Sequence, residues 1–213
     1  MKIDKILGDE LNIYLLGGAV MAINNLKSGT KDIDVLVQNK EELKTLACSL
    51  EVCGYILLQP QDLSKPYMKL SATALENLDG FRWKIFIEYI AKKLALTDKM
   101  KQRARTMYTG KKLTVYVLSN EDLFLLKGMT ERDRDLEDMV ILAKSGLKYD
   151  IILDECIDQS NRDQRGNNWE ASLEVKCKEL NQKYGIRVPF LKELEKLSEK
   201  RIINGNRKRT SKK

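Results

Sequence analysis

Residues 15–37 of the chain read LLGGAVMAINNLKSGTKDIDVLV, and the order of residue types in this stretch decides the fold. The apolar run at its start predicts a short strand that stops at Gly17 and Gly18. The segment AVMAINNLK then predicts a helix, and the alternation of acids with aliphatic residues in DIDVLV predicts a second strand. Because side chains alternate along a strand, Asp32 and Asp34 share one face of it.

The glycine pair and the paired acids together predict a site for a metal–nucleotide complex. With no side chain in the way, the backbone amides at Gly17 and Gly18, and the start of the helix after them, can approach phosphate oxygens closely. The carboxylates of Asp32 and Asp34 can jointly hold one or two divalent cations, since Mg²⁺ prefers oxygen ligands and bridges to a triphosphate. A glycine pair alone is often an ordinary turn, and a pair of acids on a strand is often only solvated charge. Their order and spacing favour the functional interpretation.

The composition is that of a globular protein and excludes several classes of enzyme. The chain has 213 residues, of which 43% are hydrophobic and 32% are charged. It contains no histidine, which excludes a Ser-His-Asp triad, a Cys-His pair and a His-ligated zinc site. No apolar run reaches the roughly 18 residues that a membrane span needs, and the N-terminus lacks the apolar core of a signal peptide. We therefore expect a cytoplasmic protein without a membrane partner.

The pattern along the chain changes near residue 119 from mixed strands and helices to helices alone. We predict an α/β (α+β) protein with a mixed-sheet domain over residues 1–118, a helical region over 119–203 and a disordered basic tail over 204–213. In the first domain we expect helices at 3–10, 40–52 and 98–108, and further strands at 55–58, 67–72, 82–90 and 112–118. A helical stretch is expected over 119–146, with a bend at Gly128 left open.

The basic balance of the chain belongs mostly to its last residues. The formal net charge is +7, and the segment RIINGNRKRTSKK at 201–213 holds six basic residues and no acid. The rest of the chain therefore carries a net charge of only +1. Such a tail can bind the phosphates of RNA, which would make the protein an RNA-binding partner, or it can serve solubility alone.

The quoted stretch resembles the signature of the DNA polymerase β-like nucleotidyltransferase superfamily. The form TKDID is similar to the branch that includes the abortive-infection type IV toxins and uncharacterised prokaryotic relatives. The resemblance implies that Gly17 and Gly18 position the phosphates of an NTP, such as ATP or GTP, and that Asp32 and Asp34 hold Mg²⁺ (or Mn²⁺). It implies transfer of a nucleoside monophosphate to an acceptor hydroxyl on RNA such as tRNA, on a protein or on a small molecule. A toxin role with a cognate antitoxin is a subclass of this expectation.

Other site residues are less clearly assigned by this resemblance. Ser28 and Thr30 precede the acids and are either hydroxyl contacts to phosphate or ordinary turn residues. Superfamily members usually carry a third carboxylate on a later, adjacent strand, as a metal ligand or as a base. The matching position here is Lys84, and Glu88 takes the catalytic role only through a difference in register or a bulge. Otherwise the site lacks one acid, and Lys84 repels metal ions or binds phosphate in their place, as in a catalytically impaired nucleotide-binding module.

A second motif of the same branch is similar to the run from Lys127 to Asp138, KGMTERDRDLED. The resemblance implies that Lys127 contacts phosphate and that Arg134 and Asp135 orient the nucleotide or the acceptor. On one continuous helix, Lys127 and Arg134 would lie on nearly the same face. The alternative is a solvated helix face with salt bridges, and Asp135 could also fix an arginine from within the fold.

Overall fold

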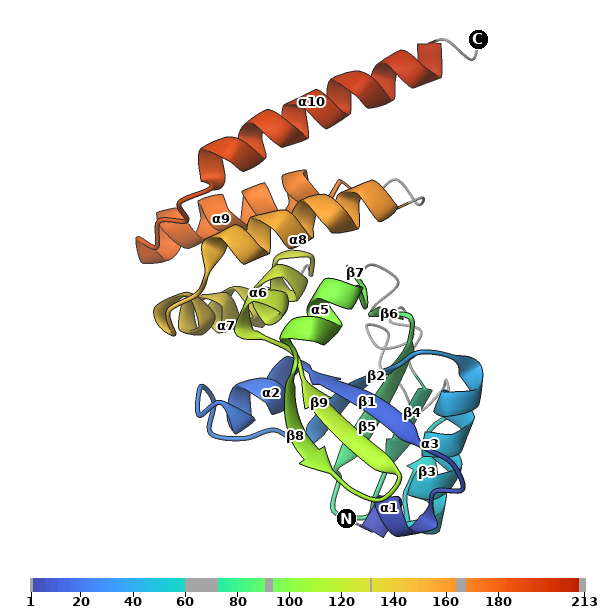
Figure 1. Ribbon diagram of the computed structural model, residues 1–213. Helices are drawn as coiled ribbons and strands as arrows, with labels where there is room; N and C mark the ends of the chain where they lie inside the picture. Colours follow the sequence, from blue (N-terminus) through green and yellow to red (C-terminus); the bar gives the residue numbers. More distant parts are fainter. Residues whose placement is uncertain (1, 60–72, 91–93, 131, 164–167, 211–213) are drawn as a thin grey trace. The chain divides into compact units, whose positions relative to one another are not determined.

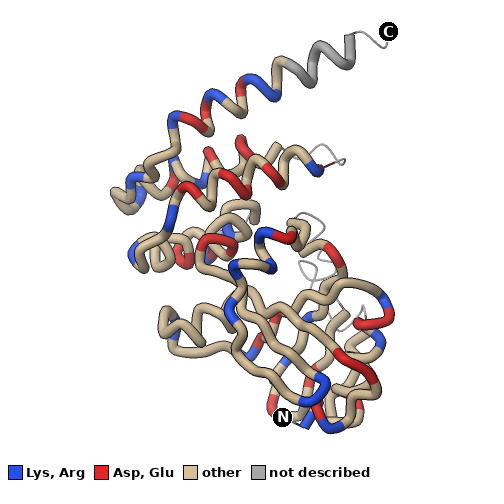
Figure 2. The backbone as a smooth tube through the Cα atoms, in the orientation of Figure 1, with Lys and Arg blue, Asp and Glu red and all other residues tan. Residues whose placement is uncertain are grey.

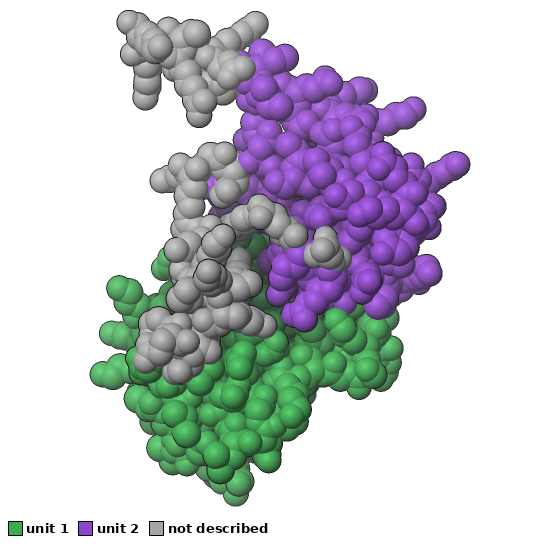
Figure 3. All heavy atoms as spheres, turned by 180° about the vertical axis from the view of Figure 1, so that it is seen from behind, with its two compact units in different colours: residues 1–119 green, residues 120–213 purple. Residues whose placement is uncertain are grey.

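The computed structural model describes the chain except for residues 1, 60–72, 91–93, 131, 164–167 and 211–213. The chain divides into two compact units, residues 1–119 and 120–213, which Figure 3 colours separately. The first unit contains a mixed sheet with helices, and the described part of the second consists of helices and their connections (Figure 1). This architecture confirms the predicted α/β fold class.

The first unit is built on a seven-stranded sheet with the strand order β3-β4-β5-β2-β1-β9-β8. These strands are β1 (Leu11–Leu16), β2 (Asp32–Val37), β3 (Ile56–Leu57), β4 (Thr73–Glu76), β5 (Arg82–Ile87), β8 (Arg105–Thr109) and β9 (Leu113–Val117). The helices of this unit are α1 (Lys2–Ile6), α2 (Gly17–Ile23), α3 (Lys40–Val52) and α5 (Asp98–Arg103). A separate two-stranded ribbon pairs β6 (Tyr89–Ile90) with β7 (Leu94–Ala95).

Strand β2 lies at the centre of this sheet, antiparallel to β1 and parallel to β5. Alternate residues of the central strands form an apolar face, on which Ile13, Val35, Leu75, Ile85 and Val115 are buried. Helix α3 packs against β2, β4 and β5 and buries Leu46 and Leu50. The burial of this face fixes the register of β2, because a slip of one residue would turn its aliphatic residues outward and its acids inward.

The helix predicted over 98–108 is wrong in its second half. Thr97 caps α5 by accepting the N–H of Met100 at 3.2 Å, but the helix ends at Arg103 and strand β8 follows. Strand β8 pairs antiparallel with β9, and the register shifts between Thr106 and Tyr108. The next strand, β9, offers a ladder of backbone partners, and this hairpin pairing outweighs the helical pattern.

Other predicted elements differ in extent. The helix expected at 3–10 ends at Ile6, and the strand expected at 82–90 is interrupted at Glu88, where φ is 55°. The strand expected at 67–72 lies outside the described residues.

The second unit contains α6 (Asn120–Gly128), α7 (Asp133–Lys144), α8 (Tyr149–Arg162), α9 (Trp169–Tyr184) and α10 (Leu191–Thr210). The helical stretch predicted over 119–146 is two helices, because the chain leaves the helix after Gly128 and re-enters it at Asp133. A Cβ atom at Gly128 would lie 2.5 Å from Cδ1 of Leu173, so the chain passes very close to α9 at this point. No helix in the described part of the chain is long and apolar enough to span a membrane.

Helix α10 is held by a buried carboxylate on α9. Glu170 accepts a hydrogen bond from the hydroxyl of Ser160 on α8 and two from the guanidinium of Arg201 on α10, at 3.1 and 2.8 Å.

Acidic and basic residues alternate along the described side chains of α10 (Figure 2). This charge pattern is typical of a solvent-facing helix surface. The helix continues into the basic segment as far as Thr210.

Asp4 joins α1 to the turn between β8 and β9. Its carboxylate accepts the backbone N–H groups of Lys112 and Leu113, both at 2.9 Å, and of Lys111 at 3.1 Å. It also accepts the hydroxyl of Tyr108 at 3.3 Å. The hydrogen bonds from Lys112 and Leu113 lower the pKa of Asp4 to about 2.

Replacing Asp4 with alanine is predicted to lower the Tm by a few degrees at neutral pH, because three backbone donors lose their charged acceptor. The folded-state pKa is below that of the unfolded chain, so this stabilisation is present above about pH 4 and is lost as the pH falls toward about 2. Thermal unfolding of wild type and Asp4→Ala, at neutral pH and at about pH 2, measures the effect. The exposed Asp9→Ala is the control, and equal Tm values at neutral pH would contradict the prediction.

Candidate functional site

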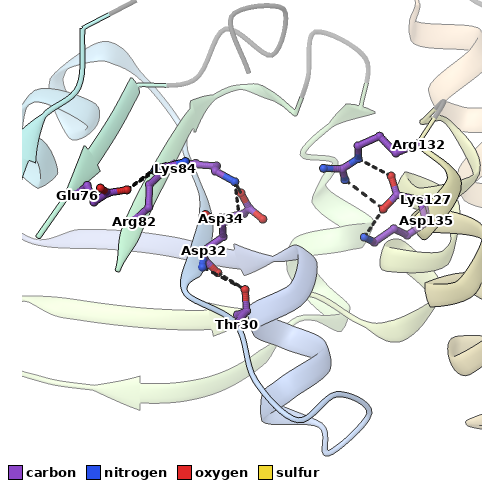
Figure 4. Close-up of polar contacts among 9 residues, drawn as sticks. All are labelled: Thr30, Asp32, Asp34, Glu76, Arg82, Lys84, Lys127, Arg132 and Asp135. Atoms are coloured by element: carbon purple, nitrogen blue, oxygen red, sulfur yellow. Dashed lines mark hydrogen bonds and ion pairs between the residues drawn. The ribbon is translucent and has the colours of Figure 1, made fainter. Parts of the chain in front are cut away.

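The carboxylates of Asp32 and Asp34 share one face of β2 with the ammonium group of Lys84 from β5 (Figure 4). Nζ of Lys84 lies 2.8 Å from Oδ2 of Asp32 and 3.9 Å from Oδ1 of Asp34. The side chain of Lys84 is only 5% exposed, whereas those of Asp32 and Asp34 are 29% and 20% exposed. The lysine is therefore buried against the sheet, and the two acids remain partly accessible to solvent.

Strand register explains this arrangement. Asp34 lies directly opposite Lys84, and Asp32 lies opposite Arg82. The guanidinium of Arg82 turns to the other side, toward β4, where its Nε donates to Oε2 of Glu76 at 2.8 Å. Opposite charges on neighbouring strands stabilise the pairing of a sheet. Lys84 thereby pairs with both acids of β2 while Arg82 pairs with Glu76.

The glycine pair lies where β1 ends, beside the acids. Leu16 is opposite Asp34, so the next residue, Gly17, directly adjoins that carboxylate. Gly17 has a φ of +67°, and a Cβ atom there would lie 2.5 Å from Oδ2 of Asp34. Glycine is therefore required at residue 17, both for the backbone conformation and for the approach of the acid. At Gly18 a Cβ atom would lie 3.5 Å from Oγ1 of Thr30, which is an ordinary contact.

The hydroxyl-bearing candidates occupy the turn before β2. Oγ1 of Thr30 accepts the N–H of Asp32 at 3.1 Å and donates to the carbonyl oxygen of Asp32 at 3.3 Å. Thr30 thus fixes the backbone at the start of β2, as a turn residue does. Ser28 is exposed in the same turn. Contact of either hydroxyl with phosphate stays a prediction.

The structure does not bring Glu88 to the acid pair. Glu88 follows the end of β5, is exposed, and donates its N–H to the carbonyl of Val37, the last residue of β2. It is four residues beyond Lys84, which corresponds to about 13 Å along an extended strand. Lys84, not Glu88, lies opposite Asp34. A catalytic role for Glu88 stays a prediction that this geometry does not favour.

The donor set does not fit a pair of divalent cations. Asp32 and Asp34 provide carboxylate oxygens, but the ammonium group of Lys84 is already within ion-pair distance of both. Among the described residues, no group of three or more Cys, Asp or Glu side chains could hold a metal ion. Positive charge beside the carboxylates opposes the binding of a further cation. Mg²⁺ or Mn²⁺ at this pair therefore stays a prediction.

A second charged cluster joins α6 to α7 within the helical unit. Nζ of Lys127 donates to Asp135 at 2.6 Å and to Asp138 at 2.7 Å, and all three side chains are at most 6% exposed. Arg132 donates two further hydrogen bonds to Asp135, from Nε at 2.7 Å and from Nη2 at 3.1 Å. The hydroxyl of Thr130 donates to the same carboxylate. The salt bridges of the alternative considered from the sequence are present, but Lys127, Asp135 and Asp138 are buried rather than solvated, and the side chain of Arg132 is 43% exposed.

This cluster holds α6 and α7 together through buried ion pairs. Burial would raise the pKa of Asp135, but the charge of Lys127 and the hydrogen bonds from Lys127, Thr130 and Arg132 lower it below its ordinary value. The expectation that Asp135 fixes an arginine is confirmed by its bidentate contact with Arg132. Arg134 is exposed on α7, and the break after α6 means that the seven-residue spacing does not place it on a common helix with Lys127. Nucleotide contacts of Lys127, Arg134 and Asp135 stay predictions.

Comparison with known proteins identifies the family. The model of a family described as "Nucleotidyltransferase of unknown function (DUF6036)" matches residues 2–155. The chain belongs to this family. The matched range of the nucleotidyltransferase family contains the glycine pair, the acid pair with Lys84, and the cluster around Lys127.

Other comparisons add little to the family assignment. The crystal structure of JHP933 from Helicobacter pylori is 16% identical, over 96% of this chain and 93% of that chain, with a TM-score of 0.39. No curated protein matches the chain.

The two glycines are predicted to differ in their tolerance of a side chain. Gly17→Ala should lower the free energy of unfolding by about 1–2 kcal/mol or more, because alanine is strained at this φ and its Cβ displaces Asp34. Gly18→Ala should change the free energy of unfolding by less than about 0.5 kcal/mol, because its Cβ would make only ordinary van der Waals contacts. Urea unfolding of both variants measures this difference, and similar losses at the two positions would refute it.

Breaking the Lys127 cluster is predicted to destabilise the helical unit. Asp135→Asn removes one partner of a buried ion pair and should cost about 3 kcal/mol. Because the pKa of Asp135 is lowered in the folded state, its stabilisation is present above about pH 4 and is lost as the pH falls below that. Chemical unfolding measures the effect, with Glu137→Gln, an exposed acid on the same helix, as the control. A loss no larger than that of the control would argue against a structural role.

Proposed function

We propose that this protein binds a nucleoside triphosphate where β1 ends and β2 begins, and transfers the nucleoside monophosphate to an acceptor hydroxyl. Membership of a nucleotidyltransferase family supports the reaction class. The observation that carries the proposal for this site is the approach of Asp34 to Gly17, where only the absence of a side chain lets the carboxylate meet the turn. Gly17 is buried beside Asp34 and Gly18 is half-buried, so we propose that phosphate approaches the turn at Gly18, next to the acid pair.

The proposed reaction is a displacement at the α-phosphorus of the triphosphate. A new bond forms between the acceptor oxygen and the α-phosphorus, and the bond to the oxygen that bridges the α- and β-phosphates breaks. The acceptor proton passes to a carboxylate of the pair Asp32 and Asp34, and pyrophosphate leaves. Positioning and the neutralisation of phosphate charge supply most of the rate in such reactions.

A second candidate function is nucleotide binding without turnover. The observation that favours it is the position of Lys84 opposite Asp34, where the superfamily resemblance leads us to expect a third carboxylate. With an ammonium group in contact with both acids, the pair offers less negative charge to a metal-bound triphosphate. The two candidates differ in whether pyrophosphate is released.

We propose only the chemical class of the acceptor, which is a hydroxyl on RNA such as tRNA, on a protein or on a small molecule. A toxin role, held in check by a cognate antitoxin, is one form of the proposed activity. The acceptor class is decided by where the transferred nucleotide is found.

The test is incubation of the full chain with each of four α-labelled NTPs, Mg²⁺ or Mn²⁺, and a mixture of total RNA and cell proteins. Wild type is expected to label one class of acceptor, and Asp32→Asn with Asp34→Asn should reduce labelling at least about 100-fold. The matched control replaces two exposed acids of the same unit, Asp9→Asn with Asp98→Asn, which removes the same charge.

Three outcomes separate the candidates. Label transfer by wild type and the control, but not by the Asp32 and Asp34 variant, supports nucleotidyl transfer at this site. Undiminished transfer by that variant refutes the site. Nucleotide binding in calorimetry, with no label or pyrophosphate from wild type under any condition, favours the binding module.

A further inference from the structure

We infer that Lys84 is the resident cation of the acid pair, and that the site binds the phosphates of a nucleotide on this ammonium group in place of a full set of divalent ions. The inference rests on the proposed function, because it concerns how the same site holds its triphosphate. It names Lys84 as the residue that sets the metal requirement of nucleotide binding.

The position of Lys84 is built into the sheet. Its backbone lies in β5, between β4 and β2, and its register partner is Asp34. Its side chain is 5% exposed and ends 2.8 Å from Asp32 and 3.9 Å from Asp34. A buried lysine without a partner is strongly unfavourable, so the acids and the lysine stabilise one another's charges. The ammonium group is therefore a fixed feature of the site.

The charge of the site follows from this arrangement. Two carboxylates and one ammonium group leave a net charge of −1, where a third carboxylate at residue 84 would give −3. Divalent cations are held by the number and charge of their oxygen ligands, so affinity for free metal ions falls steeply between these two cases. A phosphate is repelled less by a site of net charge −1 than by one of −3, and the ammonium group is a strong hydrogen-bond donor to its oxygens.

Neighbouring cations have other partners. Arg82, on the same face, pairs with Glu76 on the far side of β5. Lys31, directly before Asp32, donates to the carbonyl of Asp79 at 2.9 Å and lies over the ring of Phe81. Among the ion pairs described for this part of the chain, Lys84 pairs with both acids, so a phosphate bound beside Asp32 and Asp34 would lie next to its ammonium group.

The experiment has two measurements on the full chain. The first is Mn²⁺ binding without nucleotide, followed by the loss of the free-ion EPR signal. The second is calorimetric binding of the α,β-methylene analogues of ATP, GTP, CTP and UTP, in EDTA and in Mg²⁺. Wild type should leave Mn²⁺ unbound up to about 1 mM, and its nucleotide Kd should differ by less than about threefold between EDTA and Mg²⁺.

Two substitutions at residue 84 sharpen the test. Lys84→Asp should tighten Mn²⁺ binding at least about tenfold and make nucleotide binding dependent on metal. Lys84→Met, which keeps an unbranched side chain one atom shorter and removes the charge, should weaken nucleotide binding in EDTA at least about tenfold. The matched control is Lys176→Met, a mostly buried, ion-paired lysine in the helical unit, and it should behave as wild type in both measurements.

The outcomes distinguish the inference from the proposed function. If wild type binds Mn²⁺ stoichiometrically at micromolar concentration, or binds nucleotide only with Mg²⁺, the inference about Lys84 is overturned and the proposed function stands. If wild type binds none of the four analogues in either condition, the proposed function itself fails. The wild-type measurements decide both points even where a substitution at Lys84 prevents folding.

Discussion

The pairing of β2 with β1 on one side and β5 on the other is the constraint on which the site depends. One row across the sheet joins Leu16, Asp34 and Lys84 in register. This row determines that the carboxylate of Asp34 meets Gly17 and that the lysine meets the carboxylates. The aliphatic residues on the other face of β2 hold the register, because a slip would expose them. The chemistry of the site is thus set by hydrophobic burial on the opposite side of the sheet.

Two lysines of this chain are each held by two aspartates, and burial separates their roles. Lys127 donates to Asp135 and Asp138, whose side chains are at most 5% exposed, so that cluster is a structural joint between two helices. Lys84 meets acids whose side chains are 20% and 29% exposed, so solvent or a ligand can reach the pair. The same ionic arrangement stabilises the fold where it is closed and forms a candidate binding site where it is open.

The sequence pattern predicts those elements of the fold that depend on residues close together in the chain. Strands β1 and β2, the glycine turn between β1 and α2, and the shared face of Asp32 and Asp34 all follow from periodicity within 23 residues. The pattern of residues 98–108 predicts a helix throughout, whereas the stability of strand β8 comes from pairing with β9. The sequence pointed to Lys84 as the residue at the third-acid position but left Glu88 open, because the register between β2 and β5 depends on contacts far apart in the chain. The sequence leaves open a bend at Gly128, and the structure has a full break between α6 and α7 there, where the chain lies close to Leu173 of α9.

The most direct test of the account is a crystal structure of the full chain soaked with a non-hydrolysable NTP analogue and Mn²⁺, with the metal located by anomalous scattering. The account predicts a triphosphate beside Gly18, with Nζ of Lys84 within hydrogen-bond distance of a phosphate oxygen and at most one Mn²⁺ ion at the acid pair. Two Mn²⁺ ions bridged by Asp32 and Asp34, with the ammonium group of Lys84 displaced from both carboxylates, would contradict it.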